Sequence, residues 1–240
     1  MSTWKKILIP TLISLTIGGI YLYSVWKHRQ NPGVIGQQDS SQNLTMDDVA
    51  VVRMEFPQHF NDLLELQGKS VWMKNGYTMP YFPYAAGKVE FGKRVGEIPS
   101  GQKLEVERII KAAVPANVND GIGHGSRQAM VVFSMPDGKD LFATPAGVME
   151  GNEENYYCDL LFFYDDPHTI YSNWPKDVWA AIDAHQVKPG MNELQTRMAI
   201  GQKMHPDSQN EGNRTVTYDQ SGQKWTVTFV KNRATTIRNS

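Results

Sequence analysis

The chain has 240 residues and a formal net charge of −1, with 24 lysine and arginine residues against 25 aspartate and glutamate residues. This balance leaves no excess of basic residues to bind phosphates, so no nucleic-acid partner is expected. Cys158 is the only cysteine, which rules out an internal disulfide and, with it, the class of small disulfide-stapled secreted modules. The length suffices for one large or two small domains with hydrophobic cores.

An uncharged run from Ile7 to Trp26 has the length of a membrane span. At about 1.5 Å per residue, a helix over this run is about 30 Å long, the thickness of a bilayer's hydrocarbon core. A secretory signal peptide is the alternative, but its apolar region is shorter and a small-x-small cleavage site follows it. No such site lies between Ser24 and Ile35. We therefore predict residues 1–29 as an uncleaved, single-pass anchor.

The charges beside this segment do not orient it. Lys5 and Lys6 precede it, and Lys27 and Arg29 follow it. The number of positive charges is therefore nearly equal on the two sides, and the positive-inside rule gives no orientation. Residues 30–45 are rich in Gln, Ser, Gly and Asn and have few apolar side chains to bury, which predicts a linker. The membrane is the first expected partner, and the side on which the remaining chain lies must be inferred from other features.

Residues 46–171 predict a mostly-β domain with short helices at its start, over 47–56 and 60–67. Further strands are indicated by five alternating or apolar segments separated by Gly, Pro and Asn clusters: 69–74, 88–93, 103–114, 128–135 and 140–146. A turn is expected over 135–139, where Pro and Gly stand between two strands. Short strands and tight turns predict a small SH3-like barrel, with 155–166 as a final strand buried on both faces.

Residues 172–240 predict an α-α-β-β unit. The first helix is expected over 175–186, where a proline occupies the first turn and the apolar residues share one face. The second is expected over 191–201 with a glycine at its end. Two alternating segments, 214–219 and 224–231, flank a Ser-Gly turn and predict a hairpin. The fold class expected for the whole chain is α+β.

The region from 175 to 240 resembles the SmpA/OmlA family, the small lipoprotein subunit of the outer-membrane β-barrel assembly machinery. The shared features are the start and stop of the second helix and one pattern in each strand: Gly190-Met191, Gly201, Tyr218 and Val227-x-Phe229. The family is anchored through a lipidated cysteine, which this chain lacks after its N-terminal segment. The resemblance implies an α/β sandwich used for protein contacts in the bacterial envelope, with the soluble part outside the cytoplasm.

Two groups of residues could carry chemistry. Cys158 could act as a nucleophile if His168 or His185 lay beside it, but its apolar surroundings in the sequence indicate a core residue. Asp165, Asp166 and His168 could hold a divalent cation, but the Asp-Asp-Pro-His sequence is also typical of a turn. We predict no catalytic residue, no metal site and no cofactor.

Two surfaces are candidates for binding a partner. The first is an aromatic, proline-rich loop whose rings could instead cover one end of the barrel: Tyr77, Tyr81, Phe82 and Tyr84. The second is the helix of the C-terminal unit: Met191, Leu194, Gln195 and Met198.

These features predict a non-enzymatic protein-interaction module of the bacterial cell envelope. It would be held in the inner membrane by a single pass, face the periplasm and bind a protein partner there. One alternative is a cell-wall or peptide-binding SH3-like module. The other is an enzyme that uses Cys158, His168 and Asp165.

Overall fold

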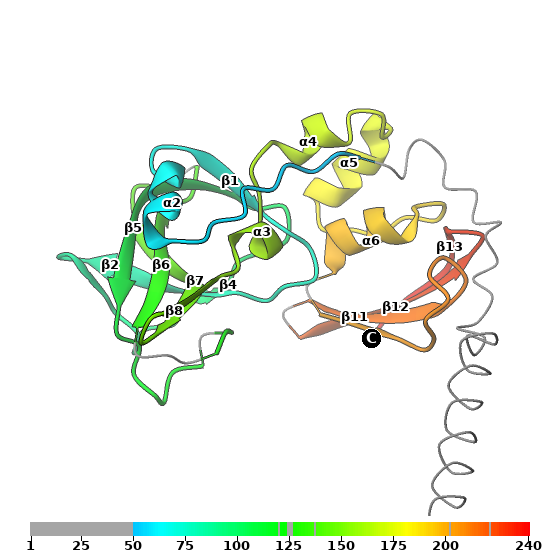
Figure 1. Ribbon diagram of the computed structural model, residues 1–240. Coiled ribbons are helices and arrows are strands. Elements are labelled where there is room, and N and C mark those ends of the chain that lie inside the picture. Colours follow the sequence, from blue (N-terminus) through cyan, green and yellow to red (C-terminus); the bar gives the residue numbers. More distant parts are fainter. Residues whose placement is uncertain (1–49, 120, 124–126, 137, 202, 221) are drawn as a thin grey trace, which may run out of the picture. The chain divides into compact units, whose positions relative to one another are not determined.

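The computed structural model describes residues 50–240 except 120, 124–126, 137, 202 and 221 (Figure 1). The predicted anchor, Ile7 to Trp26, and the predicted linker, 30–45, lie outside these residues. The described part is a strand-rich mixed fold of antiparallel sheets. No helix within it is long and apolar enough to cross a membrane.

The first sheet has nine strands, and its central path runs in the order β3-β2-β7-β6-β5-β1-β9, with β4 paired to β2 and β8 to β7. The strands are β1 (Ser70–Met73), β2 (Pro80–Ala85), β3 (Lys88–Val89), β4 (Gly96–Glu97), β5 (Lys103–Ala112), β6 (Arg127–Ser134), β7 (Leu141–Glu150), β8 (Glu153–Tyr156) and β9 (Phe162–Phe163). Every pairing is antiparallel.

Strand β6 is buried on both faces and organises this sheet. Because successive side chains point to opposite faces, Val131 and Phe133 enter the larger hydrophobic cluster, called the first core here. Met130 and Val132 enter a smaller cluster on the other face. The apolar segments predicted as strands over 69–74, 103–114, 128–135 and 140–146 are confirmed as β1, β5, β6 and β7.

Three predictions for this region are wrong. No helix occupies residues 50–56, which have no regular secondary structure; the helical pattern begins only with α2 (Phe60–Leu63) and the 3-10 helix η2 (Leu64–Leu66). The expected last strand over 155–166 is split into β8, the one-turn helix α3 (Cys158–Leu161) and β9, because the amides of Leu160 and Leu161 turn back to the Tyr157 carbonyl. The expected aromatic loop is strand β2.

The C-terminal region contains α4 (Pro167–Ile170), α5 (Lys176–Asp183) and α6 (Glu193–Ile200). A four-stranded antiparallel sheet follows: β10 (Lys203–Pro206), β11 (Thr215–Gln220), β12 (Gln223–Val230) and β13 (Arg233–Asn239). The two predicted helices and the predicted hairpin are confirmed. Strands β10 and β13, which no sequence pattern predicted, extend that hairpin on both sides.

Helix α6 starts later than predicted because of its cap. The Asn192 side chain accepts a hydrogen bond from the Gln195 amide, and the Gln195 side chain accepts one from the Asn192 amide. The helix therefore begins at Glu193 rather than at Met191, and it ends at Ile200 with Gly201 as its C-cap, the position expected for this glycine. Its inner face joins the sheet's buried side chains in the second core: Ile200, Val216, Tyr218, Val227 and Phe229.

Over the described residues, 50–240, the two cores belong to one compact unit. Phe163 lies on β9, which pairs with β1 in the first sheet, yet its ring belongs to the second core. The Gly76 amide donates to the Gly201 carbonyl at 2.8 Å and adds a backbone link between the regions. The boundary predicted between residues 171 and 172 therefore crosses a continuous set of contacts.

Candidate binding cleft beneath the strap

Residues 50–57, called the strap here, form no helix or strand and cross the surface from the C-terminal helices toward α2 (Figure 1). Asp159 on α3 holds this segment. Its Oδ1 accepts a hydrogen bond from the Glu55 amide at 2.9 Å, and its Oδ2 accepts one from the Phe56 amide at 2.8 Å. A carboxylate that accepts two backbone amides fixes the path of the chain, because charged acceptors make the stronger hydrogen bonds.

Two further side chains tie the strap to the body of the protein. The Tyr164 hydroxyl donates to Asp159 Oδ1 at 2.8 Å, and burial raises the pKa of this phenol, so the hydroxyl stays protonated as a donor. Arg53 places its guanidinium 5.5 Å from the centre of the Tyr164 ring. The same side chain forms ion pairs with Glu55 at 2.9 Å and Asp165 at 3.3 Å.

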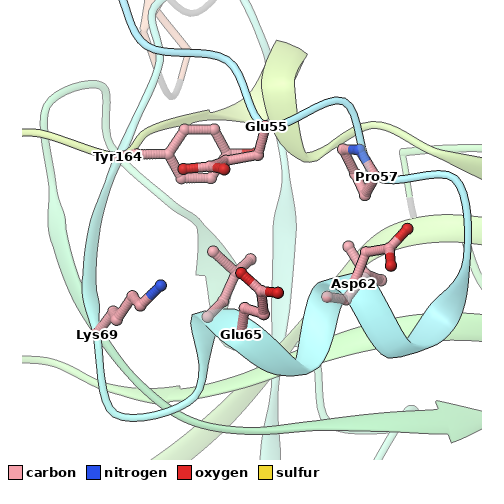
Figure 2. A pocket seen from close by; sticks show the side chains of 8 residues that line it. Glu55, Pro57, Asp62, Glu65, Lys69 and Tyr164 are labelled. Atoms are coloured by element: carbon pink, nitrogen blue, oxygen red, sulfur yellow. The ribbon is translucent and has the colours of Figure 1, made fainter.

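Between the strap and α2 lies a cleft of about 270 Å³. Figure 2 shows Glu55 and Tyr164 on one side of the hollow and Glu65 and Lys69 on the other. The lining combines carboxylates with one ammonium group and a short apolar floor: Glu55, Pro57, Asp62, Leu63, Glu65, Leu66, Lys69 and Tyr164. With three acidic side chains against one basic side chain, the cleft favours a ligand that carries positive charge.

The carboxylates of the cleft differ in how many hydrogen bonds and ion pairs they already form within the protein. Asp62 Oδ2 accepts the amides of Gln58 and His59, each at 2.8 Å, and these bonds lower its pKa. Glu55 is paired with Arg53. Glu65 forms no hydrogen bond or ion pair within the described part of the chain, so its carboxylate is the one most available to a ligand.

The outer side of the strap carries large apolar side chains. Val51, Met54 and Phe56 are 94%, 44% and 64% exposed. Ala50 and Val52 turn inward and pack against the second core. The strap is therefore an anchored segment that shows apolar groups to solvent next to an acidic cleft, which is an arrangement typical of a docking surface.

The structure places Tyr81, Phe82 and Tyr84 on β2, whereas Tyr77 lies in the loop that precedes this strand. Phe82 is buried at 1% exposure, and Tyr81 packs on Phe142 with ring centres 5.2 Å apart. Tyr84 is partly buried beside the smaller cluster, and Tyr77 is 38% exposed. These four rings do not converge on a cleft described in this region.

The predicted interaction helix is also a core element. Met191, Gln195 and Met198 are 1%, 4% and 1% exposed, and Leu194 packs against the second core. Met191, Gln195 and Met198 therefore stabilise the fold and are not accessible to a partner in this structure. Three of the four residues predicted to form this binding surface are therefore buried in the structure.

Among the described residues, Cys158 forms no hydrogen bond with His168 or His185, and of the three candidate metal ligands only Asp166 and His168 contact each other. Cys158 is fully buried, its Sγ lies 3.9 Å from the Ala146 carbonyl, and burial raises the thiol pKa to about 12. His168 instead contacts Asp166 at 2.9 Å and Asp183 at 3.2 Å. In the described ranges, no group of three or more His, Cys, Asp or Glu side chains is arranged to hold a metal ion.

The strap and Asp159 were missed by the sequence analysis. Asp159 contacts Glu55 and Phe56, which lie 104 and 103 positions earlier in the sequence. No local sequence pattern indicates a contact between residues so far apart. The alternation of Val52, Met54 and Phe56 with charged residues was the available signal for a non-helical segment.

Comparisons of the chain with protein-family models, with curated proteins and with solved structures found no match.

Proposed function

We propose that this chain is a membrane-tethered, non-enzymatic protein-interaction module of the bacterial cell envelope, and that the strap is its docking surface. The observation that carries the proposal is the strap itself, where Val51, Met54 and Phe56 are exposed while Asp159 fixes the backbone beneath them. A segment that is already ordered loses little conformational entropy on binding. Its apolar side chains then contribute buried area to a complex.

The chemistry of the partner follows from the surroundings of the strap. The neighbouring cleft presents Glu65 without an ion pair among the described residues, together with Glu55 and Asp62. A partner segment that alternates apolar residues with lysine or arginine would cover Met54 and Phe56 and place a cation in the cleft. Electrostatic complementarity of this kind favours fast and specific association.

The cellular setting of the proposal is supported by the sequence. The uncharged run from Ile7 to Trp26 supports a single-pass anchor in the inner membrane, and the resemblance of residues 175–240 to the SmpA/OmlA family supports a periplasmic location. The proposal also includes an SH3-like fold for residues 46–171, and the antiparallel pairing of the strands in this region supports it. A reporter fused after Ser240 tests the orientation, because activity of a cytoplasm-only reporter would contradict it.

The docking surface is tested by crosslinking in cells. A photo-crosslinking residue is placed at Met54 in one strain and at Val230 in another, since both positions are about half exposed and Val230 lies on β12, away from the strap. We expect a discrete crosslinked protein from position 54 and none from position 230. The variant Met54→Ser, Phe56→Ser should lose the partner in co-purification.

The matched control is Val230→Ser, which also removes an exposed apolar side chain but should keep the partner. Equal crosslinking from both positions, or a partner retained by the strap variant, would contradict the proposed docking surface. Far-ultraviolet circular dichroism of each variant shows whether the fold is intact.

A further inference from the structure

Two neighbouring cavities lie beside the C-terminal helices, and no residue of the strap lines either of them. The first, about 170 Å³, is lined by the turn that precedes β5 and by residues of α4, α5 and α6: Ser100, Gln102, Lys103, His168, Trp179, Asp183 and His185 among others. The second is a shallow, open cavity of about 610 Å³, lined by the chain between α5 and α6 and by the ends of β12 and β13: Ala184, His185, Gln186, Val187, Gln223, Trp225 and Asn239. His185 lines both.

The first cavity is formed by rigid elements of both core regions. The turn at Ser100 is held by backbone hydrogen bonds, since the Gly101 amide donates to Met73 and the Gln102 carbonyl accepts from Met73. On the opposite side, the His168 ring stacks on Trp179 with centres 4.0 Å apart. Cavities at the junction of two packed regions are the preferred positions of ligand sites.

Two buried polar atoms in these walls have no hydrogen-bond partner among the described residues. Ser100 is 4% exposed, and its hydroxyl oxygen is unpaired. The indole Nε1 of Trp225 is also buried and unpaired. A buried polar group without a partner is costly, so each of these groups would gain from a ligand that supplies one.

The remaining polar groups can both donate and accept hydrogen bonds. Gln102, Gln186, Gln223 and Asn239 contribute carboxamides, which pair with hydroxyl groups in either direction. His185 Nδ1 lies 3.2 Å from the Ala199 carbonyl, so in the neutral ring Nδ1 holds the proton and Nε2 is an acceptor.

The charge of the lining argues against anionic and lipid ligands. Lys103 is the single cation of the two cavities, and its ammonium group is already 2.6 Å from Glu105. Asp183 adds a negative charge at the wall. An anion would therefore find no free positive charge here, and an alkyl chain would leave the amide and imidazole groups unpaired.

We propose that these cavities form a binding site for a neutral oligosaccharide, with one sugar ring against the Trp225 indole and the hydroxyls of the next held by Ser100, Gln102 and Asp183. An aromatic face covers the C–H side of a sugar ring, and carboxamides and carboxylates match its hydroxyls. This site is separate from the strap and does not rest on the proposed protein partner.

The test uses the full chain in a detergent without a sugar headgroup and follows tryptophan fluorescence during titration with cellotriose and with chitotriose. We expect saturable binding of at least one of the two, and the Trp225→Phe variant should lose the signal change. Asp183→Ala and Gln223→Ala, one in each cavity, should each weaken binding about tenfold.

Asp177→Ala is the matched control, since Asp177 is on α5 with Asp183 but lines neither cavity. It should bind like the parent. The proposal is overturned if neither trisaccharide changes the fluorescence, or if Asp183→Ala and Gln223→Ala both bind like the parent. Saturable binding of trialanine, with no binding of either sugar, would also overturn the proposal and assign the two cavities to a peptide ligand.

Discussion

The carboxylate of Glu193 and the guanidinium of Arg214 form an ion pair inside the C-terminal region, with the side chains 1% and 6% exposed. Arg214 Nε donates to Glu193 Oε1 at 3.0 Å, and the Gly212 amide donates to Oε2 at 2.9 Å. Arg214 also donates to the Ser208 carbonyl at 3.0 Å. The pair thus fixes the loop between β10 and β11 against the start of α6.

We predict that Glu193→Gln lowers the free energy of unfolding by about 3–5 kcal/mol, because it leaves the Arg214 charge buried without its partner. Urea unfolding monitored by circular dichroism measures the change. Glu211→Gln is the control, since Glu211 and Arg197 form a looser pair at 3.7 Å with 54% and 28% of their side chains exposed. That variant should lose at most about 1 kcal/mol, and a similar loss from both variants would contradict the prediction.

Asp159→Ala should release the strap without unfolding the domain. The amides of Glu55 and Phe56 lose their acceptors, so their hydrogen exchange should accelerate, and the free energy of unfolding should fall by about 1–3 kcal/mol. Asp165→Ala removes an ion pair with Arg53 but no backbone contact, and it serves as the control. Unchanged exchange at Glu55 and Phe56 in Asp159→Ala would show that other contacts hold the strap.

The buried thiol of Cys158 predicts a specific loss of stability at alkaline pH. Burial, and secondarily the neighbouring Asp159, raises its pKa from an ordinary 9.0 to about 12. The folded state therefore keeps a proton that the unfolded state releases, and the resulting stability is complete below pH 9.0 and is lost as the pH rises toward 12. Unfolding midpoints should fall over this range.

Buried tyrosines also have raised pKa values, so they too reduce stability at alkaline pH. The variant Cys158→Ala separates the contribution of the thiol from theirs. The variant should be less stable at neutral pH, since it leaves a small cavity, but its stability should decline less steeply above pH 9.0. Parallel declines for the parent and the variant would show that the thiol does not contribute. Alkylation by iodoacetamide should likewise be slow in the native protein and fast in urea.

The elements that the sequence predicted correctly are those with a strong local pattern. Strand β6 was identified by its unbroken apolar run, and β11 and β12 by alternation that places Val216, Tyr218, Val227 and Phe229 on one face. The end of α6 was marked by Gly201. In the three strands the pattern reflects which side chains are buried, and the burial of those apolar side chains stabilises the strands that the pattern predicted.

The missed elements depend on partners that are distant in sequence. Pro80 and Pro83 made β2 look like a loop, but β2 lies near the sheet's margin, where prolines are tolerated. The strap follows its path because Asp159 holds it, and both cavities of the proposed saccharide site combine segments that only the tertiary fold brings together. Local propensity contains no information about such contacts.

Gly147 on β7 is a final test of how closely the first sheet is packed. A Cβ atom there would lie 2.5 Å from Tyr156 Cδ1 and 2.9 Å from the Asn155 carbonyl oxygen on β8. Gly147→Ala should therefore lower the free energy of unfolding by about 1–3 kcal/mol through overpacking. Gly92→Ala, with open space around the added atom, should change it little.

A second substitution distinguishes this collision from an effect on the backbone. If the Tyr156 ring is the obstacle, Tyr156→Ala should cost less in the Gly147→Ala protein than in the parent, because the crowding is relieved in the double variant. A double-mutant cycle by urea unfolding measures the difference. Strictly additive losses would mean that the Asn155 backbone, which cannot move aside, rather than the ring, excludes a side chain at position 147.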